Sequence, residues 1–348
     1  MLPRLTSPNR VCCSKVLLCV GFLWPSPLCT GGEAPENPKP VTLGAYLQEL
    51  GYGSIPLKRT DQNHLAVEGE IAGKKAVFVI DTGNSFTRLD KKSGSRFKTL
   101  AERGLRLEDP NLGELTGTNF VLVEELKLGT ARFPNQPAIV MALAHVGTIN
   151  YEDCLIGCDF LLRHHCLVDC AGLKLYVRAD KPSADLRAAL ESSLRRSGYH
   201  ETVLRPTRAI VESCPASVNG VALRLVVDSG SVFTFLDDQR GQQSPLAKLR
   251  VSYTAELNFG VGKRGGTPIY AADPESFQID GIELPLRGLH LGVTDMISYS
   301  IGSQWQNVDG VLGADVLALT RSLVDLENRR LWFVIPKNTA PSKPRAPK

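Results

Sequence analysis

The chain has 348 residues, of which 43% are hydrophobic and 22% are charged, and its formal net charge is +4. This composition is typical of a globular protein that can bury a sizeable core, and the length suggests about two domains. Several basic residues lie in the two end segments, and no basic patch interleaved with aromatic residues stands out. We therefore expect no nucleic acid as a partner.

Residues 1–32 are predicted to be a signal peptide. Residues 1–15 carry three positive charges, Val16 to Trp24 is apolar, and Ser26 to Gly32 contains small residues and helix breakers. We therefore expect export to the periplasm or the extracellular space. Two alternatives stay open, namely a disordered amino terminus and a lipid anchor on Cys29. No other stretch comes near the ~20 apolar residues needed to cross a bilayer, so no stable membrane span is expected.

The rest of the chain divides into a linker at 33–41, a first lobe at 42–179, a second lobe at 180–335 and a disordered, proline-rich tail at 336–348. Each lobe is predicted to begin with a helix, over Thr42 to Leu50 and over Ser183 to Ser197. In both segments leucines recur at helical spacing and a glycine follows.

A strand hairpin is predicted after each helix. In the first lobe, His64 to Ile71 and Ala76 to Ile80 are apolar or alternating runs around Gly73. In the second lobe, we expect the hairpin around Asn219-Gly220, between Ala209 to Val211 and Val221 to Val227. The sheets are therefore expected to be mainly antiparallel.

One stretch of the chain occurs twice. Val79 to Asp90 contains Asp81-Thr82-Gly83, and Asp228-Ser229-Gly230 recurs 147 positions later in Val226 to Asp237. Such a triplet alone is weak evidence, because all of its residues are ordinary turn residues. The same offset, however, holds without a gap for about forty residues of both halves. The chain therefore carries one loop in two copies.

The chemistry of this loop follows from its residues. In each copy an apolar, β-branched run predicts a buried strand that ends on a carboxylate. If the two turns face each other, Asp81 and Asp228 come into contact and share one proton, because two like charges so close do not both ionise easily. One carboxyl is then a base and the other an acid, which is an apparatus for activating water.

A second register, with an offset of 156, pairs Leu155 to Leu161 with Val311 to Leu317 and Leu167 to Asp169 with Leu323 to Asp325. With the two Asp-Thr/Ser-Gly triplets, Leu155-Ile156-Gly157 and Val311-Leu312-Gly313 resemble the hallmark of the pepsin and retropepsin superfamily of aspartic proteases. The resemblance covers roughly residues 41 to 335. Each half is similar to a single retropepsin unit, as in bacterial-type retropepsin-like proteins.

This resemblance implies a mainly β acid-protease fold with two pseudo-symmetric, retropepsin-like β-barrel lobes and short helices. It implies an aspartic endopeptidase with Asp81 and Asp228 as the catalytic pair, with no cofactor and no metal. The substrate would be an extended peptide or protein, and the chain would act as a monomer that is an intramolecular pseudo-dimer. Thr82 and Ser229 are expected to brace the two loops, and Gly83 and Gly230 to leave room at the base of the site. The candidate flap residues, which would lie in mobile hairpins over the substrate, are Gly117, Gly262 and Gly265.

The rival hypothesis is a noncatalytic peptide-binding or scaffold protein that keeps the duplicated fold. Asn84 stands where the family usually has a small residue, and the first candidate flap contains no tyrosine. Retention of both aspartates favours the enzyme, although fold alone does not establish function.

Three further expectations concern residues outside the pair. His64 has no counterpart in the repeat, where Val211 stands, and is expected on an exposed strand or loop. Asp159 and Asp315 are interpreted as structural carboxylates near helix amino termini. Four cysteines between Cys154 and Cys170 favour at least one disulfide over a zinc site, because their spacing is not a standard zinc pattern.

Overall fold

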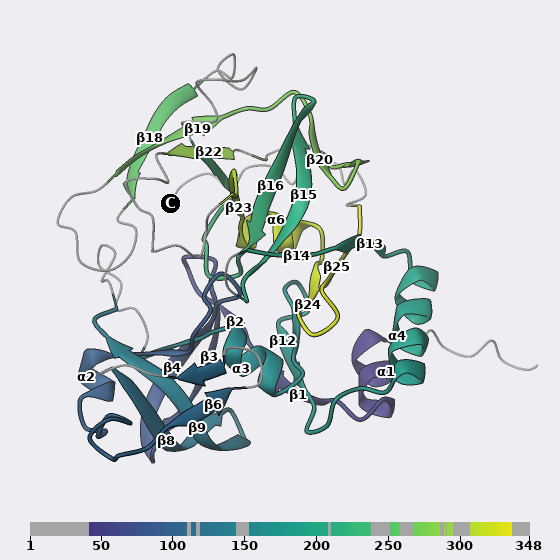
Figure 1. Ribbon diagram of the computed structural model, residues 1–348. Coiled ribbons are helices and arrows are strands. Elements are labelled where there is room, and N and C mark those ends of the chain that lie inside the picture. The colour runs from purple at the N-terminus through teal and green to yellow at the C-terminus, as the bar shows by residue number, and fades with distance from the viewer. Residues whose placement is uncertain are drawn as a thin grey trace, which may run out of the picture. The chain divides into compact units, whose positions relative to one another are not determined.

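The computed structural model describes residues 42–109, 113–115, 119–143, 153–207, 210–237, 251–257, 267–285, 289, 291–294 and 307–335 (Figure 1). The predicted signal peptide, Cys29, the linker and the tail lie outside these residues, and so do the flap candidates Gly117, Gly262 and Gly265.

Two amphipathic helices occupy equivalent places in the two halves. Helix α1 spans Leu43–Glu49 and helix α4 spans Ala184–Arg196. Each begins at a hydroxyl cap, because Thr42 Oγ1 accepts a hydrogen bond from the Ala45 amide at 3.3 Å and Ser183 Oγ accepts one from Leu186 at 3.2 Å. Both predicted helices are confirmed. Their buried leucines join one small apolar cluster with Trp332.

The first half is built on a seven-stranded sheet whose strands neighbour one another in the order β2-β3-β4-β10-β5-β9-β8. Their bounds are Lys58–Arg59 for β2, Leu65–Ile71 for β3, Lys74–Ile80 for β4, Cys154–Ile156 for β10, Arg88–Asp90 for β5, Ala131–Met141 for β9 and Phe120–Leu128 for β8. The first half also contains the helices α2 (Lys91–Gly94) and α3 (Cys158–Arg163) and the hairpin of β6 (Leu107–Asp109) with β7 (Gly113–Leu115).

The second half is built on a ten-stranded sheet in the order β18-β19-β22-β17-β23-β16-β15-β20-β21, with β14 beside β15. The bounds are Val251–Leu257 for β18, Thr267–Ala272 for β19, Leu291–Thr294 for β22, Phe235–Asp237 for β17, Gly310–Leu312 for β23, Val221–Val227 for β16, Glu212–Val218 for β15, Phe277–Ile279 for β20, Ile282–Glu283 for β21 and Arg205–Pro206 for β14. Helix α6 spans Ala314–Leu319.

A third sheet, of six strands, takes three strands from each half, in the order β1-β12-β11-β24-β25-β13. The strands are β1 (Gly53–Pro56), β12 (Lys174–Val177), β11 (Leu167–Asp169), β24 (Leu323–Asp325), β25 (Arg330–Phe333) and β13 (His200–Val203). In Figure 1, β12, β24 and β25 lie between the strands of the first half and those of the second. The sequence did not predict this shared sheet.

The two repeat offsets hold for whole elements. Strands β3, β4 and β5 are followed 147 positions later by β15, β16 and β17, with the same lengths. Strand β10, helix α3 and strands β11 and β12 are followed 156 positions later by β23, α6, β24 and β25. The mainly β fold class with two related lobes and short helices is therefore confirmed.

The hairpin turns have the chemistry that their sequences predict. Ala72 and Gly73 between β3 and β4 have φ of 46° and 77°, and Asn219 and Gly220 between β15 and β16 have φ of 50° and 77°. The second hairpin corrects one boundary, because its first strand is β15 (Glu212–Val218) and not Ala209 to Val211.

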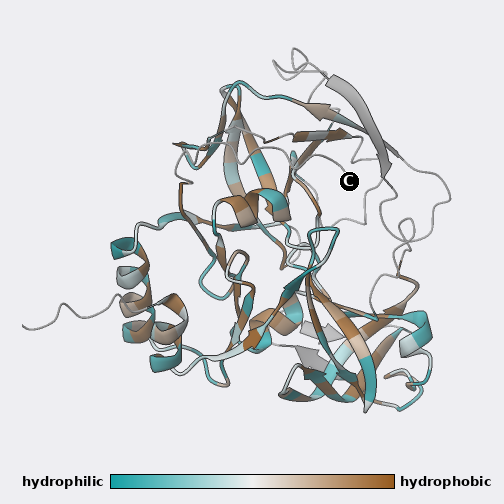
Figure 2. Cartoon of the chain, turned by 180° about the vertical axis from the view of Figure 1, so that it is seen from behind, coloured by the Kyte–Doolittle hydropathy of each residue, from teal (hydrophilic) through white to brown (hydrophobic). Residues whose placement is uncertain are grey.

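A continuous hydrophobic core draws on both halves, with Phe78 and Phe133 from the first and Phe277 and Phe333 from the second. In Figure 2 brown hydrophobic residues recur along the strands of both halves. Strands are mainly antiparallel, as predicted, and the parallel pairs are β4 with β10, β16 with β23, β5 with β9 and β17 with β22. Among the described residues, no helix has the length and apolar character that a bilayer crossing requires.

Candidate active site

Each predicted aspartate stands at the end of a buried strand. Strand β4 ends at Ile80 and strand β16 ends at Val227, and both residues are fully buried. The Asp81 amide then donates a hydrogen bond to the carbonyl of Ile156 at 2.9 Å, and the Asp228 amide donates one to Leu312 at 3.0 Å. The aliphatic strands β10 and β23 therefore fix where each aspartate loop begins.

Thr82 and Ser229 connect the two loops, as predicted. The Ser229 amide donates to Thr82 Oγ1 at 2.9 Å, and the Thr82 amide donates to Ser229 Oγ at 3.2 Å. Each hydroxyl in turn donates to a strand-end carbonyl of the other half, Thr82 to Val227 at 2.8 Å and Ser229 to Ile80 at 2.7 Å. Both side chains are completely buried. Four hydrogen bonds therefore link the two halves beneath the carboxylates.

The structure brings the two carboxyl groups together. The side chains of Asp81 and Asp228 are hydrogen-bonded to each other and are only 7% and 6% exposed. Burial, the neighbouring charge of Asp81 and this hydrogen bond raise the pKa of Asp228 well above its ordinary value. The pair therefore holds a proton under conditions in which an exposed aspartate has lost it.

Gly83 and Gly230 leave the space that the carboxyl groups occupy. A Cβ atom on Gly83 would lie 2.3 Å from Cγ of Asp228, and one on Gly230 would lie 2.5 Å from Cγ of Asp81. No side chain fits at such distances, because these neighbours belong to the buried pair. This close approach, and not a turn conformation, explains glycine at both positions.

The two carboxylates have different surroundings. The amides of Gly83 and Gly230 donate to the nearer oxygens of Asp81 and Asp228 at 3.0 and 2.8 Å. Asn84 Nδ2 also donates to Asp81 Oδ2 at 2.7 Å. The equivalent Ser231 instead donates its hydroxyl to the carbonyl of Phe233 at 2.9 Å. Asp81 thus receives a side-chain amide donor for which the second loop has no side-chain equivalent, whereas Asp228 accepts a further hydrogen bond from the backbone of Ser231.

Asp159 and Asp315 hold the segments that follow the two aspartate loops, which agrees with their predicted structural role. Asp159 Oδ1 accepts from the amide and hydroxyl of Thr87 at 2.7 and 2.8 Å, and Asp315 Oδ1 accepts from Thr234 Oγ1 at 2.8 Å. Burial raises the pKa of Asp159 to about 6. These bonds tie helices α3 and α6 to the segments that follow the aspartate loops.

The expectation that His64 is exposed is wrong. Its side chain is 1% exposed, and its ring hydrogen-bonds to the backbone of Gly230 while facing the charge of Asp81. Burial lowers the pKa of His64, so the neutral ring is favoured. The signal was in the repeat, because the equivalent residue, Val211, is apolar and completely buried. Sequence reasoning therefore missed a residue that joins the two halves beside the pair.

The disulfide prediction is also wrong. Cys154, Cys158, Cys166, Cys170 and Cys214 are all buried free thiols. The thiols near the site point to backbone carbonyls, as Cys158 Sγ does to Thr82 at 3.2 Å, and so are not directed at one another. Within the described residues, no group of three or more His, Cys, Asp or Glu side chains is arranged to hold a metal ion.

The predicted flap glycines Gly117, Gly262 and Gly265 lie outside the described residues. In the described residues that flank these glycines in the sequence, strands β6 and β7 pair in the first half and strands β18 and β19 pair in the second. In the first half this pairing, Leu107 to Leu115, lies earlier in the chain than Gly117. The flap role of the three glycines stays a prediction.

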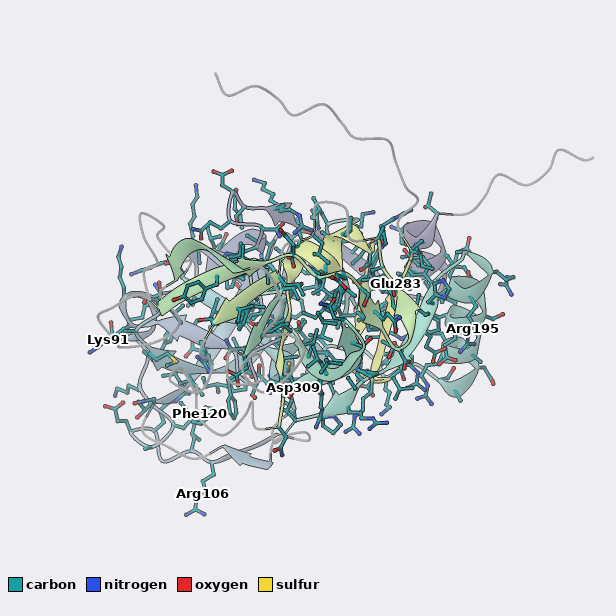
Figure 3. All side chains as sticks on the ribbon, turned by 90° about the horizontal axis from the view of Figure 1, so that it is seen from above. Lys91, Arg106, Phe120, Arg195, Glu283 and Asp309 are labelled. Atoms are coloured by element: carbon teal, nitrogen blue, oxygen red, sulfur yellow. The ribbon has the colours of Figure 1, made fainter. Side chains whose placement is uncertain are left out.

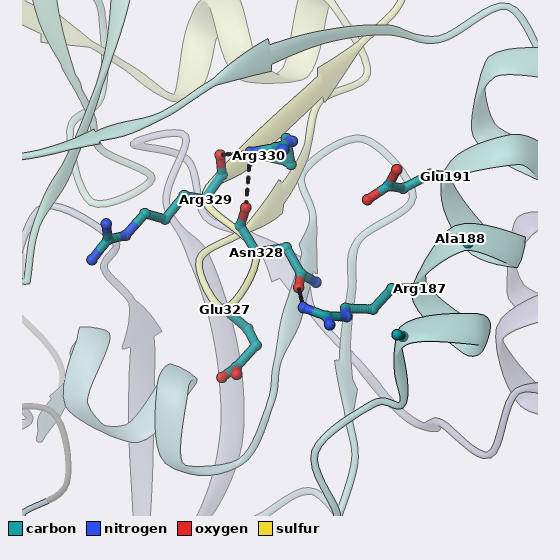
Figure 4. A pocket seen from close by; sticks show the side chains of 8 residues that line it. Arg187, Ala188, Glu191, Glu327, Asn328, Arg329 and Arg330 are labelled. Carbon is teal, nitrogen blue, oxygen red and sulfur yellow. Dashed lines mark hydrogen bonds between the residues drawn. The ribbon is translucent and has the colours of Figure 1, made fainter.

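A separate polar pocket lies between α4 and the turn from Glu327 to Arg330 (Figure 4). Its charged groups are already engaged with the protein, since Arg187 donates to Asn328 at 3.1 Å and Arg330 donates to Glu201 at 2.5 Å. Its lining includes neither aspartate of the pair. We therefore assign the candidate active site to the aspartate pair alone.

Residues 67–160 match the aspartyl protease family. This segment contains Asp81 with its loop and strand β10, so the resemblance found in the sequence is confirmed there, whereas Asp228 is identified by the repeat and the geometry. No curated protein matches the sequence. Among solved structures, the aspartic proteinase from Irpex lacteus is similar, with 14% sequence identity and a TM-score of 0.45, over 82% of this chain and 97% of that chain.

Proposed function

We propose that this chain, which contains an aspartyl protease family segment, is an aspartic endopeptidase that hydrolyses peptide bonds with water. The observation that carries this proposal is the buried hydrogen bond between the carboxyl groups of Asp81 and Asp228. A pair that shares one proton supplies a base and an acid at the same point, which hydrolysis of an amide needs.

The surroundings of the two carboxyls support a division of roles. Asp81, with the extra donor from Asn84, is the ionised base that takes a proton from the attacking water. Asp228, whose pKa is raised, is the protonated acid that donates its proton to the carbonyl oxygen as the oxyanion develops. Asp81 then passes the proton that it took from water to the leaving nitrogen, and Asp228 recovers its own proton when the tetrahedral intermediate collapses. Thr82 and Ser229 act as positioning residues that hold the two loops in this relationship.

The proposed substrate is an extended peptide or an unfolded protein segment, held by backbone hydrogen bonds in the manner of an added strand. Since both aspartates come from one chain, a monomer provides the whole site. The aspartate chemistry needs neither a cofactor nor a covalent intermediate.

We also propose that the chain is exported by its first 32 residues. The test is amino-terminal sequencing of the protein recovered from the outer compartment of the expressing cell. A mature terminus near Gly31 or Gly32 supports export, and an intact Met1 in the cytoplasm contradicts it.

The decisive experiment for the activity is to incubate the protein with a mixed peptide library at several pH values, with and without a transition-state-mimicking inhibitor of aspartic proteases. Inhibitor-sensitive cleavage is the expected result. If no peptide is cleaved at any pH but extended peptides bind, the noncatalytic peptide-binding function replaces the peptidase.

A further inference from the structure

One row of side chains crosses the first-half sheet on the face that carries Asp81. The strand registers place Val79 opposite Leu155, Leu155 opposite Arg88, and Arg88 opposite Ile139. Ile139 is in turn opposite Phe120, which is labelled in Figure 3. Residues directly opposite in paired strands project from the same face. Asp81 follows Val79 by two positions, so strand alternation places it on that face.

This row does not belong to the main hydrophobic core. The alternating neighbours of its members, such as Leu89, Ile156 and Ala138, are buried in that core, whereas Leu155, Arg88, Ile139 and Phe120 are only partly buried. Phe86, also partly buried, meets Phe120 edge to face, with the ring centroids 5.5 Å apart. Apart from Val79, which is 1% exposed, the row is therefore a partly covered, mainly apolar surface beside the proposed active site, and Arg88 is its one cation.

Arg88 is unusual for a cation on such a surface. Its Nε atom is buried and has no hydrogen-bond partner among the residues that the structure describes. Burial lowers the pKa of Arg88, and the charge that counteracts this effect is that of Asp81. Asp81 is, however, already engaged with Gly83, Asn84 and Asp228. A guanidinium has five donors in a planar fork, so a partly buried one favours a planar anion that accepts two of them.

The second half offers no such cation at the equivalent position. There the residue is Phe235, which is 2% exposed and packs in the core near Phe233. The partly buried cation is therefore a feature of the first half alone and is not shared by the two copies of the repeat.

We propose that Arg88 forms a subsite for a carboxylate side chain of the substrate, so that the enzyme selects Asp or Glu close to the scissile bond, with apolar residues beside it. This inference rests on the proposed peptidase function. A bidentate contact between guanidinium and carboxylate satisfies two of the five donors of Arg88. It also offsets the repulsion that an acidic side chain would meet from the ionised member of the pair.

The test compares matched peptides that differ only by Glu or Gln at one position, measured above about pH 5, where glutamate is ionised. We expect kcat/KM to be about tenfold or more higher for Glu than for Gln at one position near the cleaved bond. In Arg88→Met this ratio should fall to about 1, and in Arg88→Glu a Lys peptide should be preferred at that position. Because the ratio is taken within each variant, a general loss of activity does not obscure it.

Arg132→Met is the matched control, because Arg132 lies on the same sheet but is exposed and paired with Glu125 at 2.9 Å. It should leave the ratio unchanged. Equal cleavage of the Glu and Gln peptides at every position by the wild type, or an unchanged preference in Arg88→Met, overturns the subsite while the peptidase stands. If nothing is cleaved, the same peptides are compared as ligands by fluorescence anisotropy, and equal binding of both overturns the subsite as well.

Discussion

Thr82 and Ser229, which are 147 positions apart in the chain, donate to each other's half symmetrically. Each hydroxyl accepts from the partner's amide and donates to the carbonyl that ends the partner's strand. The floor of the site is therefore also a contact that holds the two halves together, and it is completely buried. Changes at these two residues should affect stability and catalysis together.

Thr82→Val is expected to destabilise the protein by about 2 kcal/mol or more, because it leaves the Ser229 amide and the Val227 carbonyl buried without this partner. Ser229→Ala should cost a similar amount, and the double variant should cost less than the sum. Denaturant unfolding measures these changes. Thr202→Val is the control, because Thr202 is equally buried but its Oγ1 has no partner among the described residues, and it should be close to neutral.

Asp81→Asn and Asp228→Asn should each abolish peptide cleavage, and the double variant should be hardly worse than either, because the pair works as one unit. The wild-type pH profile should be bell-shaped. Activity falls on the acid side as the base is protonated, and on the alkaline side as Asp228, whose pKa is raised, loses its proton. Circular dichroism should show all variants folded. Substantial cleavage by either single variant would place the chemistry elsewhere.

Gly83→Ala should abolish activity and lower stability, because its Cβ atom would lie 2.3 Å from Cγ of Asp228 and force the pair apart. Gly53→Ala is the matched control, because its nearest neighbour would be Cγ2 of Val177 at 3.6 Å, an ordinary contact. The measurements are peptide cleavage and thermal unfolding. An active Gly83→Ala variant would show that the close packing of the two loops is not required.

Asn84→Ala should lower kcat/KM about tenfold, because it removes a charge-assisted hydrogen bond to the proposed base. Asn84→Ser introduces the residue that stands at the equivalent position, Ser231, and should recover part of the loss if a hydroxyl can replace the amide donor. Unfolding measurements should show little change in either variant, which separates the effect from damage to the fold. Full activity of Asn84→Ala would contradict the prediction that the hydrogen bond from Asn84 distinguishes Asp81 from Asp228 in catalysis.

The free energy of unfolding should depend on pH through the buried carboxyl group of Asp159. Burial raises the pKa of Asp159 to about 6 in the folded state, above the ordinary value of about 3.9 in the unfolded chain. The folded state therefore binds the proton more readily, and this contribution is fully present below about pH 4 and is lost as the pH rises to about 6.

Asp159→Asn, which keeps an acceptor for Thr87, should remove part of that dependence, on the order of 1–3 kcal/mol between these pH values. Denaturant unfolding at several pH values checks the slope, with Asp90→Asn as a partly exposed control. An identical slope in Asp159→Asn and the wild type would contradict the assignment.

The sequence could predict the site because the repeat constrained it. Asp81 and Asp228 come together where the offset placed them, and Thr82 and Ser229 bond across as their hydroxyls suggested. Local sequence patterns gave wrong predictions where contacts between distant segments determine the burial or orientation of a side chain. His64 follows a loop and is polar, so its sequence suggests exposure, although the second half packs over it. The cysteines are close in sequence, but the strand and helix that carry them direct the thiols to carbonyls.

The shared sheet has a consequence for how this chain could have arisen. Strands β11 and β24, which occupy equivalent places in the two halves, meet antiparallel with Val168 opposite Val324. Two identical strands that pair in this way form an isologous contact, so one half has the edge geometry of a self-associating subunit. In a symmetric dimer, any substitution appears in both copies of the site. Covalent fusion removes that restriction, and the pairs Asn84 with Ser231, Arg88 with Phe235 and His64 with Val211 are differences that only a fused chain can hold.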